Sequence, residues 1–376
     1  MMGVLMSDSD KDFFEGKRPW SIIKDQVLGN YMSPYIAKVN KLGRPILLID
    51  GYAGPGVFGD RKPGSPLLMC QAAEKFAKGR YQAIFINKDE KYHEKLEGIL
   101  TKANWSGSAK AVIGDSTILL QMLPYTLTDQ TVFLYLDPFG LRGCEFALLE
   151  PFLKRNPQYS TEILLTMSMP IVHRLASRHA VEEGRQDVQQ IKSYHQRLTK
   201  VFGGDYWQDI LWQQNASPED RETQLIEAYR AKLAAYLPFT GSCPVRERTD
   251  TRIKYFIVFA SRQLDAMVLL NDIMVKAYFS RMHEGDFAGG LWEETDWREM
   301  RSIEGLDKEI ISLVEKYPGE SRKSIWSRVV RAHFMRYLEP EYNARVQQLV
   351  LAKKLTHSNP RGTNRLNDDC KLRLLV

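Results

Sequence analysis

Five short runs of apolar residues follow one another along the first half of the chain, and each ends in a turn or an acidic residue. Their hydrophobicity is continuous rather than alternating, which is typical of strands buried on both faces of a parallel sheet. The segments between them are long enough for one crossover helix each. The pattern therefore predicts an open α/β sheet covered by helices. The runs are residues 45–49, 83–86, 111–113, 131–136 and 162–166.

Other periodicities extend this sheet on both sides. Residues 19–39 place Trp20, Ile23, Val27 and Tyr31 at helical spacing, so an amphipathic helix is expected before the first strand. Residues 175–240 are mostly polar with a helical pattern and predict a helical insertion. After it, residues 244–249 and 254–260 predict a closing pair of strands.

The last quarter of the chain has a different pattern. Residues 286–304 predict a linker, and three helix patterns then begin near residues 306, 321 and 340. A polar turn and a short apolar end follow, as expected for a β-hairpin. Three helices and a hairpin are the plan of a winged helix-turn-helix. We therefore predict one domain over 15–285 and a second, winged-helix domain over 305–376.

Charge is distributed unevenly between these parts. The chain has 376 residues and a net charge of +6; residues 301–376 hold 15 Lys and Arg against 9 Asp and Glu, and the remainder holds 37 of each. A local basic excess suits a polyanionic partner, because each neutralised phosphate releases a counterion. We expect RNA or DNA to be that partner. The candidate contact residues are Lys353, Lys354, Arg361 and Arg365.

Other features narrow the class of protein. Cys70, Cys144, Cys243 and Cys370 are far apart and form no Cys-x-x-Cys pair, so neither a cysteine metal site nor a disulfide scaffold is expected. No apolar stretch approaches the roughly 20 residues that cross a bilayer. The chain is predicted to be cytoplasmic, without a membrane segment and without a metal.

The strongest local motif is Asp-Gly-Tyr-Ala-Gly-Pro-Gly, which directly follows the first predicted strand. Its glycines permit a sharp turn and let a ligand approach bare backbone. No Gly-Lys-Ser/Thr follows, so a nucleoside triphosphatase is disfavoured. The motif resembles the adenosylmethionine-binding loop of nucleic-acid methyltransferases, in which the acid faces the methionine ammonium; a tight turn without ligand is the alternative. The predicted cofactor contacts are Asp50, Gly51, Tyr52, Ala53, Gly54 and Gly56.

The ends of the next two strands carry further polar residues. In methyltransferase folds an acid after the second strand holds the ribose; here Asn87 stands at that place, with Asp89 two positions on. Asp115 and Ser116 follow the third strand, where the resemblance implies recognition of the adenine amino group. Each acid taken alone fits a helix N-cap equally well. Their joint placement at strand ends favours ligand binding.

The fourth strand leads into Asp137, Pro138, Phe139 and Gly140, the predicted catalytic residues. An exocyclic amine is a poor nucleophile because its lone pair is delocalised into the ring. A carboxylate and a proline-flanked carbonyl that accept its two N–H bonds draw the nitrogen towards tetrahedral geometry. An aromatic ring stacks the base. The segment resembles that of tRNA N2,N2-dimethylguanosine methyltransferases, and a strand-ending Asp-Pro turn is the alternative.

As a whole, the chain resembles the three-Cys-motif partner (TcmP) family, which is methyltransferase-like. The resemblance covers roughly residues 15–375 and rests on the segments already described, with the helix bearing Trp20 and Lys24, Gly64-Ser65-Pro66, and residues 162–168 and 255–261. It implies a Rossmann-like methyltransferase sheet and a three-Cys-motif protein of iron–sulfur type as a neighbour. Members commonly have Lys-His on the first helix, whereas this chain has Lys24-Asp25.

These patterns predict an adenosylmethionine-dependent methyltransferase that acts on an exocyclic amine of a nucleic-acid base. One alternative is a non-catalytic or regulatory partner of an iron–sulfur-type protein that binds the cofactor and nucleic acid without turnover. Another is a small-molecule methyltransferase whose winged helix only dimerises.

Overall fold

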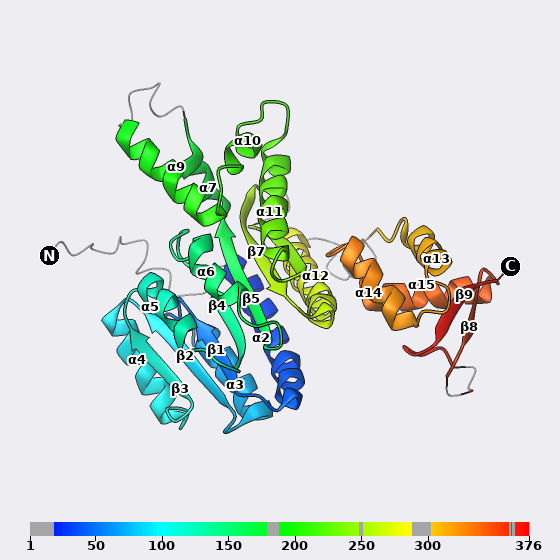
Figure 1. The fold of residues 1–376 in the computed structure, drawn as a ribbon, viewed down its shortest axis with the longest axis horizontal. Coiled ribbons are helices and arrows are strands. Elements are labelled where there is room, and N and C mark those ends of the chain that lie inside the picture. Colours follow the sequence, from blue (N-terminus) through cyan, green and yellow to red (C-terminus); the bar gives the residue numbers. More distant parts are fainter. Residues whose placement is uncertain are drawn as a thin grey trace. The chain divides into compact units, whose positions relative to one another are not determined.

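The computed structural model describes residues 19–178, 188–247, 251–287, 302–360, 362 and 365–375, without the side chains of 19–20 and 281–287. The chain packs as two units, Met1–Arg262 and Gln263–Val376. Figure 1 traces the helices and strands of both units.

The first unit is built on a seven-stranded sheet with the order β3-β2-β1-β4-β5-β7-β6. Strands β1 to β5 are parallel, and β7 is antiparallel to both β5 and β6. All five predicted strands and the predicted closing pair are present. Their bounds are β1 Ile46–Asp50, β2 Tyr81–Asn87, β3 Ala109–Ile113, β4 Thr131–Leu136, β5 Thr161–Ser168, β6 Phe239–Arg246 and β7 Ile253–Ser261.

The order of the strands creates a switch point beside β1. The chain leaves β1 towards β2 on one side and returns to place β4 on the other. The crossovers therefore diverge at the carboxyl ends of β1 and β4, which is where open α/β sheets bind ligands. The predicted Rossmann-like sheet is confirmed to this extent.

Helices cover both faces of the sheet (Figure 1). On one face, α2 sets Tyr31 and Tyr35 against Phe133 of β4, with ring centroids 6.0 and 5.2 Å apart. The opposite face joins β1, β4, β5 and β7 to α5, α6, α7 and the insertion in one buried cluster. The covering helices are α2 Pro19–Val39, α3 Ser65–Ala77, α4 Glu90–Lys102, α5 Ser116–Met122, α6 Phe146–Leu153 and α7 Met169–Ala176, with short 3-10 turns η1 Asn40–Leu42 and η2 Leu123–Thr126.

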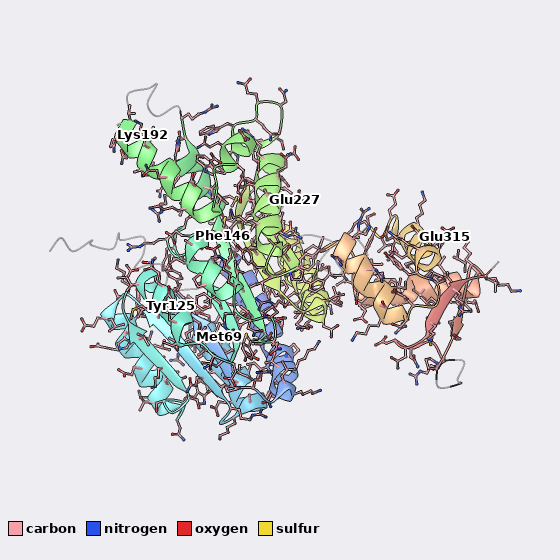
Figure 2. All side chains as sticks on the ribbon, in the orientation of Figure 1. Met69, Tyr125, Phe146, Lys192, Glu227 and Glu315 are labelled. Atoms are coloured by element: carbon pink, nitrogen blue, oxygen red, sulfur yellow. The ribbon has the colours of Figure 1, made fainter. Side chains whose placement is uncertain are left out.

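The predicted helical insertion is part of this second core. It comprises α9 Val188–Phe202, α10 Trp207–Leu211 and α11 Pro218–Ala234. Phe146 of α6, labelled in Figure 2, contacts Tyr229 of α11 edge-on at 6.4 Å. Trp207 of α10 is fully buried, and its ring meets Trp212 at 5.2 Å. The insertion therefore packs as a layer of the fold.

The second unit contains the predicted three helices and hairpin. They are α13 Leu306–Lys316, α14 Arg322–Ala332, α15 Glu339–Leu351, β8 Leu355–Ser358 and β9 Lys371–Leu374. An isolated bridge pairs Ser321 with Lys371, so the segment before α14 adds a third edge to the hairpin. Trp326 and Tyr342 stack at 5.1 Å in the core between α14 and α15.

Helix α12, Leu264–Phe287, belongs to the second unit by its packing. Asn271 donates to the carbonyl oxygen of Tyr337 at 2.8 Å and accepts from the amide of Met335 at 2.8 Å. The division between the units therefore falls after Arg262, whereas the sequence pattern predicted that the first domain extends to residue 285. Helix α12 packs against α14, a contact that the sequence pattern alone did not indicate. Most of the predicted linker, residues 288–301, lies outside the described residues.

No helix among the described residues is long and apolar enough to span a membrane.

Candidate active site at the carboxyl ends of the strands

A cavity of about 180 Å³ opens where β1, β4 and β5 end. It brings the loop after β1 together with the turn after β4, two segments that the sequence analysis singled out separately. Tyr255 lines the same cavity because β7 runs antiparallel to β5, so that the start of β7 lies beside Ser168 at the end of β5. The lining residues include Lys24, Asp25, Tyr52, Ala53, Gly54, Pro55, Gly56, Ser65, Tyr135, Asp137, Pro138, Phe139, Thr166, Ser168 and Tyr255.

The glycines of the loop after β1 are required by its path. Gly56 has a φ of 78°, and a Cβ there would lie 2.7 Å from a Leu96 methyl carbon. Gly54 has a φ of 59° and its carbonyl oxygen accepts from the Asn87 side-chain amide at 3.0 Å. The Ser116 hydroxyl donates to the carbonyl oxygen of Gly51. The loop is thus held from β2 and α5 in one conformation.

Asp50, the last residue of β1, is fully buried beneath this loop. Its Oδ1 accepts from the Tyr52 amide at 2.9 Å. Its Oδ2 is buried and makes no hydrogen bond of normal geometry to the part of the chain that the structure describes. Burial raises the pKa of Asp50 to about 7, against the opposing effects of Ser65 and the Tyr52 amide. A buried carboxylate oxygen left in this way is suited to a cationic ligand group.

Asp137 is held from two sides. Lys24 of α2 donates to its Oδ2 at 2.5 Å, and the Thr166 hydroxyl of β5 donates to its Oδ1 at 2.5 Å. The Lys24 ammonium also lies 5.2 Å from the centre of the Tyr255 ring. A carboxylate oxygen can accept two hydrogen bonds and each oxygen of Asp137 accepts one of those just named, so both have capacity for a further donor.

Pro138 and Phe139 follow with contrasting exposure. Pro138 is buried, whereas 53% of the Phe139 side chain is exposed, although both line the cavity. A partly exposed aromatic ring that lines a cavity offers a stacking face for a planar ligand. Gly140 continues the turn but is not among the cavity residues.

Asp50, Gly51 and the other predicted cofactor contacts outside residues 52–56 are not among the residues that line the cavity. Asn87 is buried and holds the Gly54 carbonyl. Asp89 caps α4 by accepting from the Tyr92 amide at 3.1 Å. Asp115 caps α5 through the Thr117 amide. Its pKa is lowered first by the Thr117 hydroxyl, which donates to it at 2.6 Å, and also by Arg142, which it binds at 2.7 Å. The N-cap alternative therefore holds for both acids, and their roles towards a ribose and an adenine stay predictions.

Sequence reasoning assigned no role to several cavity residues. Lys24 was noted on the first helix, but nothing in the local pattern indicated that it reaches Asp137. Thr166 and Tyr255 are in strands that read only as buried apolar runs. The signal that could have identified these residues is a hydroxyl within an apolar strand, or a cation on the apolar face of a helix. A polar group buried in this way needs a hydrogen-bond partner.

The predicted nucleic-acid contacts belong to the second unit. Lys353, Lys354 and Arg365 are exposed, and Arg361 lies outside the described residues. All four cysteines are free and buried. Within the described ranges, no group of three or more His, Cys, Asp or Glu side chains is arranged to hold a metal ion.

Comparisons with known proteins give distant similarities only. No protein-family model and no curated protein sequence matches the chain. Similar solved structures include a methyltransferase from Geobacter sulfurreducens, at 13% identity over 40% of this chain and 65% of that one, with a TM-score of 0.25. They also include an O-methyltransferase from Bacillus cereus in complex with SAH, at 13% identity over 69% and 83%, with a TM-score of 0.32. An rRNA methylase from Streptococcus thermophilus matches at 9% identity over 65% and 95%, with a TM-score of 0.31. These similarities are too distant to assign a function to the chain.

Proposed function

We propose that the chain is an adenosylmethionine-dependent methyltransferase that methylates an exocyclic amine of a nucleic-acid base. One observation carries the proposal: the glycine-rich loop above Asp50 and the Asp-Pro-Phe turn after β4 line the same cavity. The first is suited to a cofactor with a cationic end, and the second to a planar amine.

The residues around Asp50 fit the cofactor. Its buried Oδ2 is available to accept from the methionine ammonium, and the loop glycines leave bare backbone above it. When bound, adenosylmethionine supplies an electrophilic methyl group. The roles of Asn87 towards the ribose and of Asp115 towards the adenine belong to the same proposal.

Asp137 and Pro138 hold and orient the substrate amine in this proposal. Lys24 and Thr166 each donate to one carboxylate oxygen of Asp137 and together fix its position and rotation. The carboxylate and the Pro138 carbonyl accept the two N–H bonds, so the nitrogen lone pair turns out of the ring plane. The methyl group would pass from the cofactor sulfur to the nitrogen, with the S–C bond breaking as the N–C bond forms and the neutral thioether leaving; Asp137 is placed to take the proton that the methylated nitrogen then loses. Phe139 stacks the extruded base.

The second unit serves as a winged helix-turn-helix in this proposal. Its support is the order of α13, α14, α15 and the hairpin, with Ser321 bridged to Lys371 as the third edge. Such a unit binds a nucleic acid, while the first unit binds and methylates one of its bases.

A second candidate function is a cofactor-binding partner of an iron–sulfur-type protein that has no turnover of its own. The observation in its favour is the Lys24–Asp137 ion pair, which already occupies part of the acceptor capacity of the carboxylate. Methyl transfer by the purified chain to any RNA or DNA would exclude it.

Adenosylmethionine binding is expected to depend on pH through Asp50. The ammonium binds the ionised carboxylate, and a group with a pKa of about 7 is mostly protonated at pH 6. Because that proton has to leave on binding, affinity is expected to be about eightfold weaker at pH 6 than at pH 7.5. Calorimetric titration of the purified protein at the two pH values measures this difference.

Asp50→Asn is the matching variant. We expect it to weaken binding at pH 7.5 by at least about tenfold and to remove the pH dependence. Burial raises the folded-state pKa of Asp50 above its unfolded value, so its destabilising effect grows as pH rises towards 7; the variant should therefore be no less stable at pH 7.5. Asp60→Asn, outside the cavity, is the control. No binding by the wild-type protein, or equal losses in both variants, would contradict the cofactor assignment.

A further inference from the structure

The hairpin of the second unit has one basic face. Lys371 and Arg373 alternate with the buried Leu372 along β9 and are both exposed. Ser358 pairs with Lys371 and Thr356 with Arg373 across the ladder. Alternate residues of a strand point to the same side, so the two cations share a face with two hydroxyls.

The same face is extended at its ends. Lys354 precedes β8, and its carbonyl oxygen accepts from the Leu375 amide at 3.1 Å, so the ladder continues to its position. Arg373 lies along the bare backbone of Gly319, with its Nε 3.6 Å from where a Cβ there would stand. Among the described residues, Lys354, Lys371 and Arg373 have no ion-pair partner, whereas nearby Arg322 is bound by Asp368.

Helix α15, in the position of a recognition helix, has the opposite character. Its first turn carries Glu339 and Glu341. Arg345, the basic residue of this helix, is held by two hydrogen bonds to Asp307 of α13. A recognition helix contacts base edges through its N-terminal residues, and an acidic first turn is repelled by phosphates.

We propose that the second unit binds the phosphodiester backbone of a nucleic acid through the face of Lys354, Thr356, Ser358, Lys371 and Arg373, and does not read bases through α15. This inference rests on the proposed nucleic-acid substrate and names the surface that holds it. Lys, Arg, Ser and Thr side chains are the usual partners of phosphate oxygens. Contacts of this kind supply affinity and position without sequence preference.

The composition of the face favours a nucleic acid over a lipid surface. Peripheral membrane binding combines basic residues with apolar side chains that enter the interface. Here the neighbours of Lys371 and Arg373 across the ladder are hydroxyls, and the exposed apolar side chain of this face is Leu375 at its end. The cations stand two residues apart on one strand, about 6.8 Å, as a fixed row.

The test is fluorescence anisotropy of the full chain with a fluorescein-labelled 24-base-pair duplex, once as RNA and once as DNA of the same sequence. The variant Lys371→Gln/Arg373→Gln is expected to bind at least about tenfold more weakly at 100 mM KCl. Its plot of log affinity against log salt should be shallower by about 1.8, from two lost phosphate contacts at about 0.9 each. Weaker binding of the double variant to either duplex supports the proposal. The duplex that the wild-type chain binds more tightly shows whether the phosphates belong to RNA or to DNA.

Matched variants separate this surface from bulk charge. Lys308→Gln/Lys316→Gln removes two exposed cations from α13 and should change affinity by less than about twofold. Gln347→Ala, on the exposed side of α15, should leave affinity unchanged. Equal weakening by both double variants, or a large effect of Gln347→Ala, overturns the proposal. So does binding to vesicles containing phosphatidylserine when neither duplex binds.

Failure here is distinguishable from failure of the proposed enzyme activity. The anisotropy measurement uses neither cofactor nor turnover, and the double variant should retain the adenosylmethionine affinity of the wild type. A chain that binds duplex through this face but transfers no methyl group would contradict the enzyme assignment alone.

Discussion

Replacing Asp137 by Ala is expected to reduce methyl transfer to a nucleic-acid substrate by about 100-fold to 1000-fold, with adenosylmethionine affinity changed by less than about twofold. The magnitude is that of losing one preorganised acceptor at the reacting group. Cofactor binding should persist because Asp50, its main polar contact in the proposal, lies on a different strand end. Transfer of labelled methyl and calorimetry measure the two quantities.

Two further variants show that the loss comes from the missing acceptor. Asp137→Ala leaves the largely buried Lys24 without its partner, so Lys24→Met/Asp137→Ala removes that orphaned charge. The double variant should be as inactive as the single one and at least as stable. Asp137→Asn keeps one acceptor oxygen and should recover part of the activity. Unchanged turnover in Asp137→Ala would remove the role proposed for this residue.

Truncating Trp207 to Ala is expected to lower the free energy of unfolding by about 3–5 kcal/mol. The side chain is fully buried, contacts the His195 and Trp212 rings, and donates to the Thr199 hydroxyl at 3.0 Å. Its loss leaves a large cavity in the core shared with the sheet and removes the hydrogen-bond partner of the half-buried Thr199 hydroxyl. Urea denaturation followed by circular dichroism measures the change.

The control for this prediction is Trp105→Ala, the same truncation at a partly exposed side chain in the turn before β3. Trp105→Ala should lower the free energy of unfolding by less than half as much as Trp207→Ala, because less buried contact area is lost. The result also tests the insertion itself. A cost below about 1 kcal/mol for Trp207→Ala would mean that α9 to α11 are an independent clamp, rather than a layer of the core.

The sheet was predictable because its strands are buried on both faces. Continuous apolar runs such as the one in β4 are the direct consequence of helices on both sides. The membership of α12 was not predictable from the same signals. Its polar contacts Asn271 and Asp272 are matched to residues near 335–339, and such long-range pairing leaves no mark in local periodicity.

In the site, the sequence pattern identified the residues that form turns of recognisable composition. It missed the residues that contribute only a side chain from a helix or strand. Gly54, Gly56 and Asp137 stand in turns with recognisable composition. Lys24 and Tyr255 line the same cavity, but they belong to a helix and a strand whose hydrophobic patterns indicate only packing against the core. Their position depends on α2 crossing β4 and on β7 entering beside β5, which are facts of topology.

The late arrival of β7 has a consequence for synthesis on the ribosome. Strand β5 is complete at residue 168, but its outer neighbour β7 ends only at Ser261. At about 5–20 residues per second, the nascent chain therefore exposes the unpaired edge of β5 for roughly 5–20 s. During that interval Glu162 lacks Ser261, and the cavity lacks the wall formed by Tyr255. Until β7 has emerged, the proposed cofactor site therefore lacks one of its walls.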